Sequence, residues 1–449
     1  MRFVLLFAVF ATCLASAQDS LPRRGTFGIP LGQLTPEAKK EPGLGSKFGL
    51  QVTADPPGKN GGDLKPGDIV VDVAGKGFKT VPEFNELVRS KLGQPSIKVG
   101  FLRNGKKQET SITILPKPAD EGPNHTTIYD HVVSNGKKMR VMVTKPKNKE
   151  GKRPVLFWIQ GITASSVDVP LANPNGMSAI LKSFSDDGWV TVRVDKEGTG
   201  DSEGGPAALV NFKSEVDIFR QTLKKIPTYD FVDSDRIYVF GHSMGGYQAP
   251  IVCNELPVKG IITYGTVTMS WFEWQMRAAR IQGPLGGEKD SEADDRIRKE
   301  MAFYHFLYNE HRTVAWIIKN HPELTATAKE QSPDGIMMSA RSVEYMQQVN
   351  DVNYCRLWET LKGARVLALF GENDFISLHE DQTLLAQIVN KVRPGAGEYQ
   401  TVPGSDHAFR KTTSFADSLD KWVGKPTEFN PAILGIMKEW IGKVESAKS

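Results

Sequence analysis

The 449-residue chain has little cysteine, no strong excess of charge of one sign and, after its first segment, no long hydrophobic run. Three cysteines are too few to build a disulfide framework. The 56 Lys and Arg residues nearly balance 52 Asp and Glu, and we find no basic stripe of the kind that nucleic-acid binding needs. With 39% hydrophobic and 24% charged residues, the composition excludes intrinsic disorder and predicts two or three globular domains.

The first segment has the pattern of a targeting signal. A basic residue precedes an apolar run over residues 3–10, and Ala15-Ser16-Ala17 supplies small residues for cleavage. We therefore predict a cleaved signal peptide over residues 1–17 and a secreted or periplasmic protein. The apolar run is shorter than the roughly 20 residues that span a bilayer, so no membrane span is expected. In an oxidising compartment Cys253 and Cys355 could pair, which the sequence leaves open.

The chain after this segment divides into a lead-in and a small module. Residues 18–42 are rich in glycine, proline and charge and predict a loose linker. Residues 43–118 predict a compact β-rich domain with one helix at 81–92 and strands at 48–52, 69–73, 96–102 and 109–115. Asn104-Gly105 between the last two strands is a strong hairpin signal.

The small module resembles a PDZ domain of the kind found in exported bacterial proteases. The resemblance rests on the strand Phe48–Val52, the turn Leu64-Lys65-Pro66-Gly67-Asp68, and the strand and helix that follow. It implies that the loop Gly43–Lys47 binds the carboxyl terminus of a peptide or protein, which adds to the sheet as an extra strand. A PDZ-shaped spacer without a ligand is the alternative.

The rest of the chain, residues 126–449, alternates strand and helix patterns, which predicts an α/β domain with a doubly wound, mostly parallel sheet. The predicted strands lie at 154–160, 189–195, 236–240, 260–264 and 365–370, and the predicted helices at 175–187, 208–225, 244–255, 378–391 and 431–445. A helical insertion over about 268–350, rich in tryptophan and methionine, breaks the alternation. It predicts a lid over a site, or else an extra helical layer.

A candidate nucleophile follows the third predicted strand. Gly241-His242-Ser243-Met244-Gly245 stands between that strand and the next helix, the context in which a G-x-S-x-G pattern forms a sharp nucleophile elbow. The turn strains the serine backbone and leaves no room for neighbouring side chains, which explains the two glycines. We predict that Ser243 is the catalytic nucleophile.

A serine needs a base, and the base needs an acid to orient it. In this architecture the chain order is serine, acid, histidine, which selects His407 in the loop before the last helix. The acid is expected at the end of the strand 365–370, where Asp374 is the first choice and Glu372 and Asp381 are alternatives.

Two backbone N–H groups are needed to stabilise the oxyanion that forms during acyl transfer. The residue after the nucleophile, Met244, offers one of them. The loop after the strand 154–160 offers the second at Ile162, because Gly161 permits a close backbone turn. We predict an oxyanion hole formed by Ile162 and Met244.

With these residues in place, the span 126–449 resembles an α/β-hydrolase, in the branch of exported bacterial esterases and prolyl-oligopeptidase-like enzymes. The segment Arg193–Gly204 is similar to a signature of that branch, although Glu197 stands where arginine is common. We therefore infer nothing about the charge of the substrate from this segment. The resemblance implies a serine hydrolase that needs no metal and no organic cofactor.

The sequence thus predicts an exported serine hydrolase that cleaves small-molecule carboxylic esters through an acyl-enzyme. Tryptophan and methionine in the insertion favour an apolar acyl or aryl group. A serine peptidase of aminopeptidase or dipeptidyl type is an alternative, with acidic residues of the insertion as candidates to hold a substrate amine: Glu288, Asp290, Glu292, Asp294 and Asp295. A PDZ-like binding protein with an inactive hydrolase scaffold is the second alternative.

Overall fold

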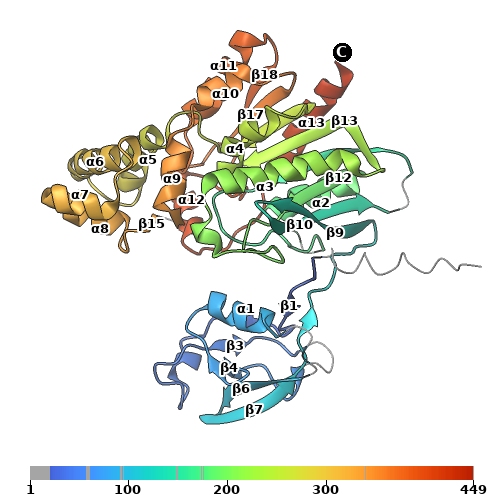
Figure 1. The fold of residues 1–449 in the computed structure, drawn as a ribbon, viewed down its shortest axis with the longest axis vertical. Helices are drawn as coiled ribbons and strands as arrows, with labels where there is room; N and C mark the ends of the chain where they lie inside the picture. The colour runs from blue at the N-terminus through green and yellow to red at the C-terminus, as the bar shows by residue number, and fades with distance from the viewer. Residues whose placement is uncertain are drawn as a thin grey trace, which may run out of the picture. The chain divides into compact units, whose positions relative to one another are not determined.

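The structure is a computed structural model that describes residues 21–56, 61–91, 94, 96–147, 150–172, 174, 176–338 and 340–447. Its contacts divide the chain into two compact units, a smaller one over Pro22–Ala119 and a larger one from Asp120 onward (Figure 1). The predicted signal peptide, residues 1–17, lies outside the described residues and stays a prediction. Among the helices that are described, none has the length and apolar character to cross a membrane.

The smaller unit is a β-sheet with one helix packed against it. Its strands follow the spatial order β2-β3-β4-β6-β7, with β5 (Lys76–Gly77) paired to β4. The bounds are β2 (Leu31–Gly32), β3 (Leu50–Val52), β4 (Ile69–Val73), α1 (Val81–Arg89), β6 (Ile97–Arg103) and β7 (Lys106–Ile112). Asn104 and Gly105 join β6 to β7 with φ of 51° and 73°, which confirms the predicted hairpin.

The predicted linker over residues 18–42 is wrong for its described part. Residues in this stretch form β1 (Gly25–Thr26), which pairs with β8 (Leu115–Pro116), and β2, which pairs with β3. The physical reason is two apolar side chains, Phe27 and Ile29, which are buried in the core of the smaller unit. The ring of Phe27 packs 5.2 Å from that of Phe84 on α1. Glycine and proline here mark turns of a folded segment.

The strand pairing gives no support to the predicted peptide site beside residues 48–52. Strand β3 pairs with β4 on one side, and on the other side β2 occupies its edge at Gln51 and Val52. An added strand needs a free edge, and β2 leaves none beside these two residues.

The larger unit has an eight-stranded mixed sheet with the spatial order β18-β17-β14-β13-β11-β12-β10-β9. The bounds are β9 (His125–Ser134), β10 (Lys137–Pro146), β11 (Arg153–Ile159), β12 (Val190–Val194), β13 (Val232–His242), β14 (Gly260–Tyr264), β17 (Arg365–Gly371) and β18 (Gly397–Val402). The five predicted strands are confirmed as β11, β12, β13, β14 and β17, and neighbours among them pair in parallel. Antiparallel β9 and β10 extend the sheet beyond them.

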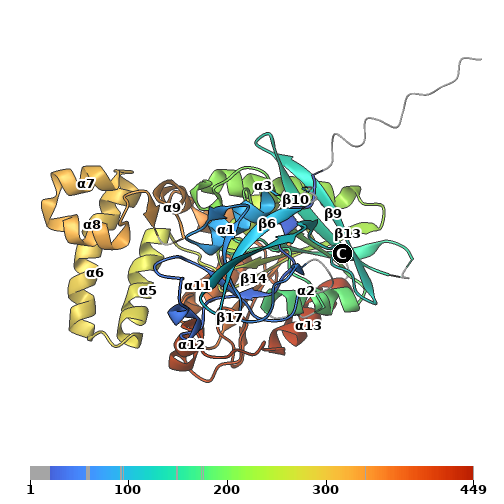
Figure 2. The same ribbon diagram turned by 90° about the horizontal axis from the view of Figure 1, so that it is seen from below.

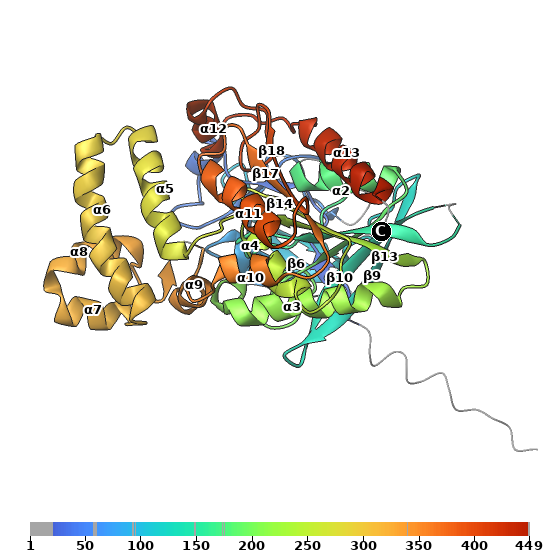
Figure 3. The ribbon, with the colours of Figure 1, turned by 90° about the horizontal axis from the view of Figure 1, so that it is seen from above.

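Helices cover both faces of this sheet, as Figure 3 shows with α2 and α13 on one side and α3 and α10 on the other. Alternate residues of β11 explain the two layers, because Phe157 enters one buried cluster and Leu156 enters the other. The bounds are α2 (Gly176–Asp186), α3 (Phe212–Lys225), α4 (Met244–Cys253), α10 (Tyr354–Thr360), α11 (His379–Val392), α12 (Phe415–Trp422) and α13 (Ala432–Ser446).

The insertion between β14 and β17 is helical, as predicted, with one short hairpin. It contains α5 (Trp271–Leu285), α6 (Asp290–Tyr304), α7 (Val314–Asn320), α8 (Thr325–Gln331), β15 (Met337–Met338), β16 (Arg341–Ser342) and α9 (Val343–Asn350). Figures 2 and 3 both show α5 to α8 gathered at one side of the sheet, away from β9. Its buried side chains join the core cluster on the α3 and α4 face of the sheet.

Candidate active site

Ser243 lies in the sharp turn between β13 and α4. Its φ of 54° and ψ of −123° are strained for a residue with a side chain, a conformation that costs about 1–3 kcal/mol and is held by its surroundings. A Cβ atom on Gly245 would lie 2.0 Å from the carbonyl oxygen of Ile159, and one on Gly241 would lie 2.6 Å from that of Gly245. Only glycine fits at both positions, which is the physical basis of the motif.

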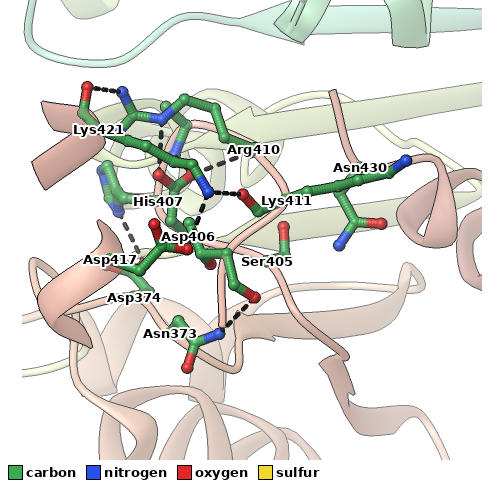
Figure 4. Close-up of polar contacts among 12 residues, drawn as sticks. Asn373, Asp374, Ser405, Asp406, His407, Arg410, Lys411, Asp417, Lys421 and Asn430 are labelled. Carbon is green, nitrogen blue, oxygen red and sulfur yellow. Dashed lines mark hydrogen bonds and ion pairs between the residues drawn. The ribbon is translucent and has the colours of Figure 1, made fainter. Parts of the chain in front are cut away.

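His407 and Asp374 form a buried hydrogen-bonded pair, drawn in Figure 4. The His407 Nδ1 atom lies 2.8 Å from Oδ2 of Asp374. The Ser377 hydroxyl donates to the same carboxyl oxygen at 2.5 Å, and the Ile376 and Ser377 N–H groups donate to the other oxygen. Burial by itself would raise the pKa of Asp374, but His407 and Ser377 outweigh it and lower that pKa. The carboxylate is therefore ionised at neutral pH.

The charge on Asp374 determines the tautomer of His407. An ionised carboxylate only accepts hydrogen bonds, so Nδ1 of the neutral imidazole carries the proton and Nε2 is left as the proton acceptor. His407 and Ser243 line the same cavity, and Asp374 lies behind the imidazole. Of the alternative acids, Glu372 accepts from the Gly404 N–H and Asp381 accepts from the Thr268 N–H.

His242, beside Ser243, makes a contact that the sequence did not indicate. Its Nε2 atom lies 2.8 Å from the backbone carbonyl of His407. A carbonyl only accepts, so Nε2 carries the proton and donates. Burial, together with the nearby His407, lowers the pKa of His242 to about 3, and this imidazole stays neutral. The only sequence signal was its place next to Ser243.

Gly265, directly after β14, is a second residue beside the pair of His407 and Asp374 that the sequence did not indicate. Its φ is +60°, and an added Cβ atom would lie 2.8 Å from Nδ1 of His407 and 2.9 Å from Oδ2 of Asp374. The backbone of Gly265 therefore packs directly against the hydrogen bond of this pair. A glycine at the end of a central strand was the available signal.

The loop that carries His407 is fixed by a second charged pair (Figure 4). The buried carboxylate of Asp406 accepts from the N–H of Ala408 and from both the N–H and the Nε atom of Arg410. Arg410 also donates through Nη1 to the carbonyl of Lys421 at the end of α12, 2.9 Å away. Asp406 thus shapes the loop from within and does not contact the imidazole through its carboxylate.

The two predicted oxyanion donors lie on the same cavity as Ser243. Ile162 and Met244 both line it, as does Gly161, whose added Cβ would lie 3.3 Å from Cβ of Ser243. Across the described part of the chain, no acceptor is hydrogen-bonded to the N–H of either Ile162 or Met244. Two unpaired N–H groups beside a nucleophile are what an oxyanion hole requires.

The cavity has a volume of about 790 Å³ and runs from Ser243 to the helical insertion. Most of its walls are aromatic or apolar: Trp158, Tyr247, Trp271, Trp274, Met338, Met346, Phe375 and Trp422. The insertion also contributes a polar group, Arg296 and Glu300, with Gln275 and Gln331. Arg296 binds Glu300 at 2.9 Å and Glu288 at 2.8 Å, so its charge is already compensated.

The acidic run and the two cysteines were the other candidate groups in the sequence. Asp294 of the acidic run binds Arg280 and Arg298, at 2.6 and 2.7 Å. Cys253 and Cys355 are free thiols in this structure. A search of the residues that the structure describes found no group of three or more side chains able to hold a metal ion.

Comparison with known families identifies the chain. The model of the family described as serine aminopeptidase, S33, matches residues 175–410, more than half of the chain, and this span contains Ser243, Asp374 and His407. The chain belongs to the serine aminopeptidase S33 family. It is accordingly a serine hydrolase with an α/β-hydrolase fold.

Solved structures similar to this S33 family member include Est1E of Butyrivibrio proteoclasticus with ferulic acid bound, 14% identical, covering 65% of this chain and 95% of that one with a TM-score of 0.40. The Pyrococcus furiosus esterase PF2001 is 12% identical and covers 64% and 87%, with a TM-score of 0.41. A putative dipeptidyl aminopeptidase IV of Bacteroides ovatus is 15% identical and covers 73% and 39%, with a TM-score of 0.39. No match was found among curated proteins.

Proposed function

We propose that this S33 family member is an exported serine esterase with Ser243 as nucleophile, His407 as base and Asp374 as orienting acid. One observation carries the proposal: His407, hydrogen-bonded to ionised Asp374 at 2.8 Å, shares a cavity with Ser243 and with two unpaired N–H groups. These are the parts that acyl transfer needs, in one place.

The geometry gives each group a step. Nε2 of His407 takes the proton of Ser243 as its Oγ attacks the ester carbonyl, and the N–H groups of Ile162 and Met244 stabilise the resulting oxyanion. The imidazolium, stabilised by Asp374, then gives its proton to the departing alcohol, which leaves an acyl-enzyme. Water, activated by the same imidazole, releases the acid and restores Ser243. None of these steps needs a metal or cofactor.

The cavity walls support an apolar acyl or aryl substrate. Trp271 and Trp274 of α5 lie 4.3 Å apart, ring centre to ring centre, and both line the cavity. Burying a long acyl chain or an aryl ring against such walls contributes about 25 cal/mol per Å² of apolar surface. In this proposal the helical insertion acts as a lid that supplies the acyl-binding wall.

The direct test is hydrolysis of p-nitrophenyl esters, from acetyl to long-chain acyl, by the mature protein. Ser243→Ala should lower kcat by roughly a million-fold, as removal of a triad serine does elsewhere. Ser234→Ala, at an exposed serine of the same strand β13, is the matched control and should keep full activity. Mass spectrometry of the exported protein should place its first residue at Gln18.

A peptidase is the second candidate, because the family is described as serine aminopeptidases and because Glu300 gives the cavity a carboxylate. Its triad chemistry would be the same. Aminoacyl p-nitroanilides separate the two: activity on these and not on esters would overturn the esterase proposal. Silence on both panels, with no labelling of Ser243 by a fluorophosphonate, would favour the inactive-scaffold alternative.

A further inference from the structure

Two buried cations hold the peptide groups on either side of Ile162. The Nζ atom of Lys196, after β12, donates to the carbonyl oxygen of Gly161 at 2.6 Å. The Nε atom of Arg341, on β16 of the insertion, donates to the carbonyl oxygen of Ile162 itself at 2.8 Å. The Lys196 side chain is 2% exposed and the Arg341 side chain is fully buried. Both carbonyls of this short loop thus accept charge-assisted hydrogen bonds.

Both cations converge on one carboxylate, Glu215 of α3. Oε1 of Glu215 lies 2.9 Å from Nζ of Lys196, and Oε2 is hydrogen-bonded to Nη2 of Arg341. Glu215 also accepts from Gln248 of α4 at 2.8 Å and from the Tyr345 hydroxyl at 3.0 Å. Burial would raise the pKa of Glu215, but the two cations lower it, so the carboxylate is ionised. The cluster therefore connects the nucleophile helix to the loop.

The orientation of a peptide group explains what this arrangement does. In a trans peptide the C=O and the next N–H point in opposite directions, so a donor that fixes the oxygen of Gly161 also fixes the direction of the Ile162 N–H. A cation on that oxygen also polarises the amide and strengthens its N–H as a donor. Gly161 has no side chain to restrain the loop, which makes such restraint from outside effective.

Stability alone does not account for the cluster. Replacing a buried ion pair or triad by apolar residues of similar volume is often neutral or stabilising, because the desolvation of the charges opposes their attraction. Lys196 illustrates the cost, since burial lowers its pKa to about 8 even though Glu215 acts against the change. A function at the loop that both cations contact gives a reason for the cluster.

We infer that Lys196 and Arg341 are positioning residues for the oxyanion hole, which aim the Ile162 N–H at the substrate oxygen from behind. Glu215 pairs with both cations and links them to α4. The inference rests on the proposed function and deepens it, because it makes the helical insertion, through Arg341, a part of the catalytic geometry.

The test uses Lys196→Met, which keeps the length of the side chain and removes its charge and donor. We expect kcat on a p-nitrophenyl ester to fall about 100-fold, the size of the effect when one oxyanion donor is lost, with KM within about threefold. Affinity for a trifluoromethyl ketone, which forms the oxyanion, should fall in parallel. Lys196→Arg should recover most of the loss. Lys224→Met, at an exposed lysine of α3, should match the wild type.

Titration of active sites with a fluorophosphonate corrects each rate for the fraction of folded enzyme. If Lys196→Met leaves too little folded protein, Arg341→Met removes the other donor while Lys196 still pairs with Glu215, and it gives the same comparison. A wild type active on esters whose variants keep kcat within twofold would overturn this inference alone. A wild type that neither hydrolyses esters nor reacts with the fluorophosphonate would overturn the proposed function and this inference with it.

Discussion

The Nε2 atom of His242 lies 2.8 Å from the backbone carbonyl of His407, which connects the nucleophile turn to the loop of the proposed base. The two residues are 165 positions apart in the chain. The His242 ring also packs 4.6 Å from Phe409, in the same loop. This histidine therefore helps to fix the turn of Ser243 relative to the loop of His407, two segments that no secondary-structure element joins.

Replacing His242 by phenylalanine should lower kcat about tenfold, because the loop of His407 loses a hydrogen bond that positions it. The buried carbonyl without its donor should also lower stability by about 1–3 kcal/mol. The ring keeps its packing against Phe409. The pKa of His242 is about 3, so its ionisation lies outside the range of pH 5 to 9, and the acid limb of the kcat profile should not move. Steady-state rates against pH measure both quantities. His379→Phe, at an exposed histidine, is the control; a shifted acid limb would contradict the assignment.

Gly265→Ala should lower kcat about 100-fold, since a displacement of catalytic groups by about 1 Å commonly costs that much. The new methyl group would contact both His407 and Asp374, at a backbone φ that disfavours alanine. Gly435→Ala, in α13, adds a methyl group with no atom within 4 Å and is the matched control. Rates per fluorophosphonate-titrated site give the comparison. Equal activity of the two variants would mean that Gly265 is not packed tightly against His407 and Asp374.

Asp381→Asn should make stability less dependent on pH. Burial raises the pKa of Asp381 from 3.8 to about 7, so the folded protein holds a proton that the unfolded chain has lost across this window. Stability from this group is therefore present below pH 3.8 and lost as the pH rises to 7. At 1.36 kcal/mol per unit, the loss is at most about 4 kcal/mol.

Urea unfolding of wild type and Asp381→Asn at pH 5 and pH 8 measures this difference. Asparagine retains an oxygen for the Thr268 N–H and replaces Oδ2, an atom that has no hydrogen-bond partner in the described structure. From pH 5 to pH 8, the free energy of unfolding of the variant should rise relative to that of the wild type. The charged groups that act on this carboxyl are Arg277, Glu273 and Glu380. If the two proteins differ in unfolding free energy by the same amount at both pH values, the pKa of Asp381 is not raised.

Ala279→Phe should shorten the range of esters that the cavity accepts. Ala279 lines the cavity from α5, and a larger side chain there fills space that a long acyl group needs. We expect kcat/KM for long-chain esters to fall about tenfold, in line with about 1–3 kcal/mol for overpacking, while acetyl esters change little. Ala302→Phe, at an exposed position of α6, serves as control. A uniform loss across chain lengths would argue against an acyl wall in the insertion.

Regular elements with a strong local pattern were predictable from the sequence. The central strands are continuous apolar runs, and β14 and β4 lie over the residues predicted for them. Strands β9 and β10 were missed because they are antiparallel additions at one end of the sheet and mix polar with apolar residues. The sequence signal for this pair is its hairpin turn, Asn135-Gly136, with φ of 49° and 75°.

Within the site, the sequence indicated the residues that can be recognised by their order along the chain. Ser243, Asp374 and His407 each follow a strand of the sheet, so topology alone predicts their meeting. His242, Gly265 and Lys196 act through contacts between distant segments, which no local pattern encodes. The pairing of β2 with β3 was missed for a similar reason, because it depends on tertiary contacts.

Arg341 stands on the same stretch of chain as the walls that would contact a substrate. An exchange of this insertion for that of another hydrolase, made to alter which esters are accepted, would bring new walls and remove the guanidinium that contacts Ile162. If Arg341 positions the oxyanion hole as proposed, such a chimera should change in turnover as well as in selectivity. Changes of single wall residues that leave β16 in place should alter selectivity without this loss of turnover.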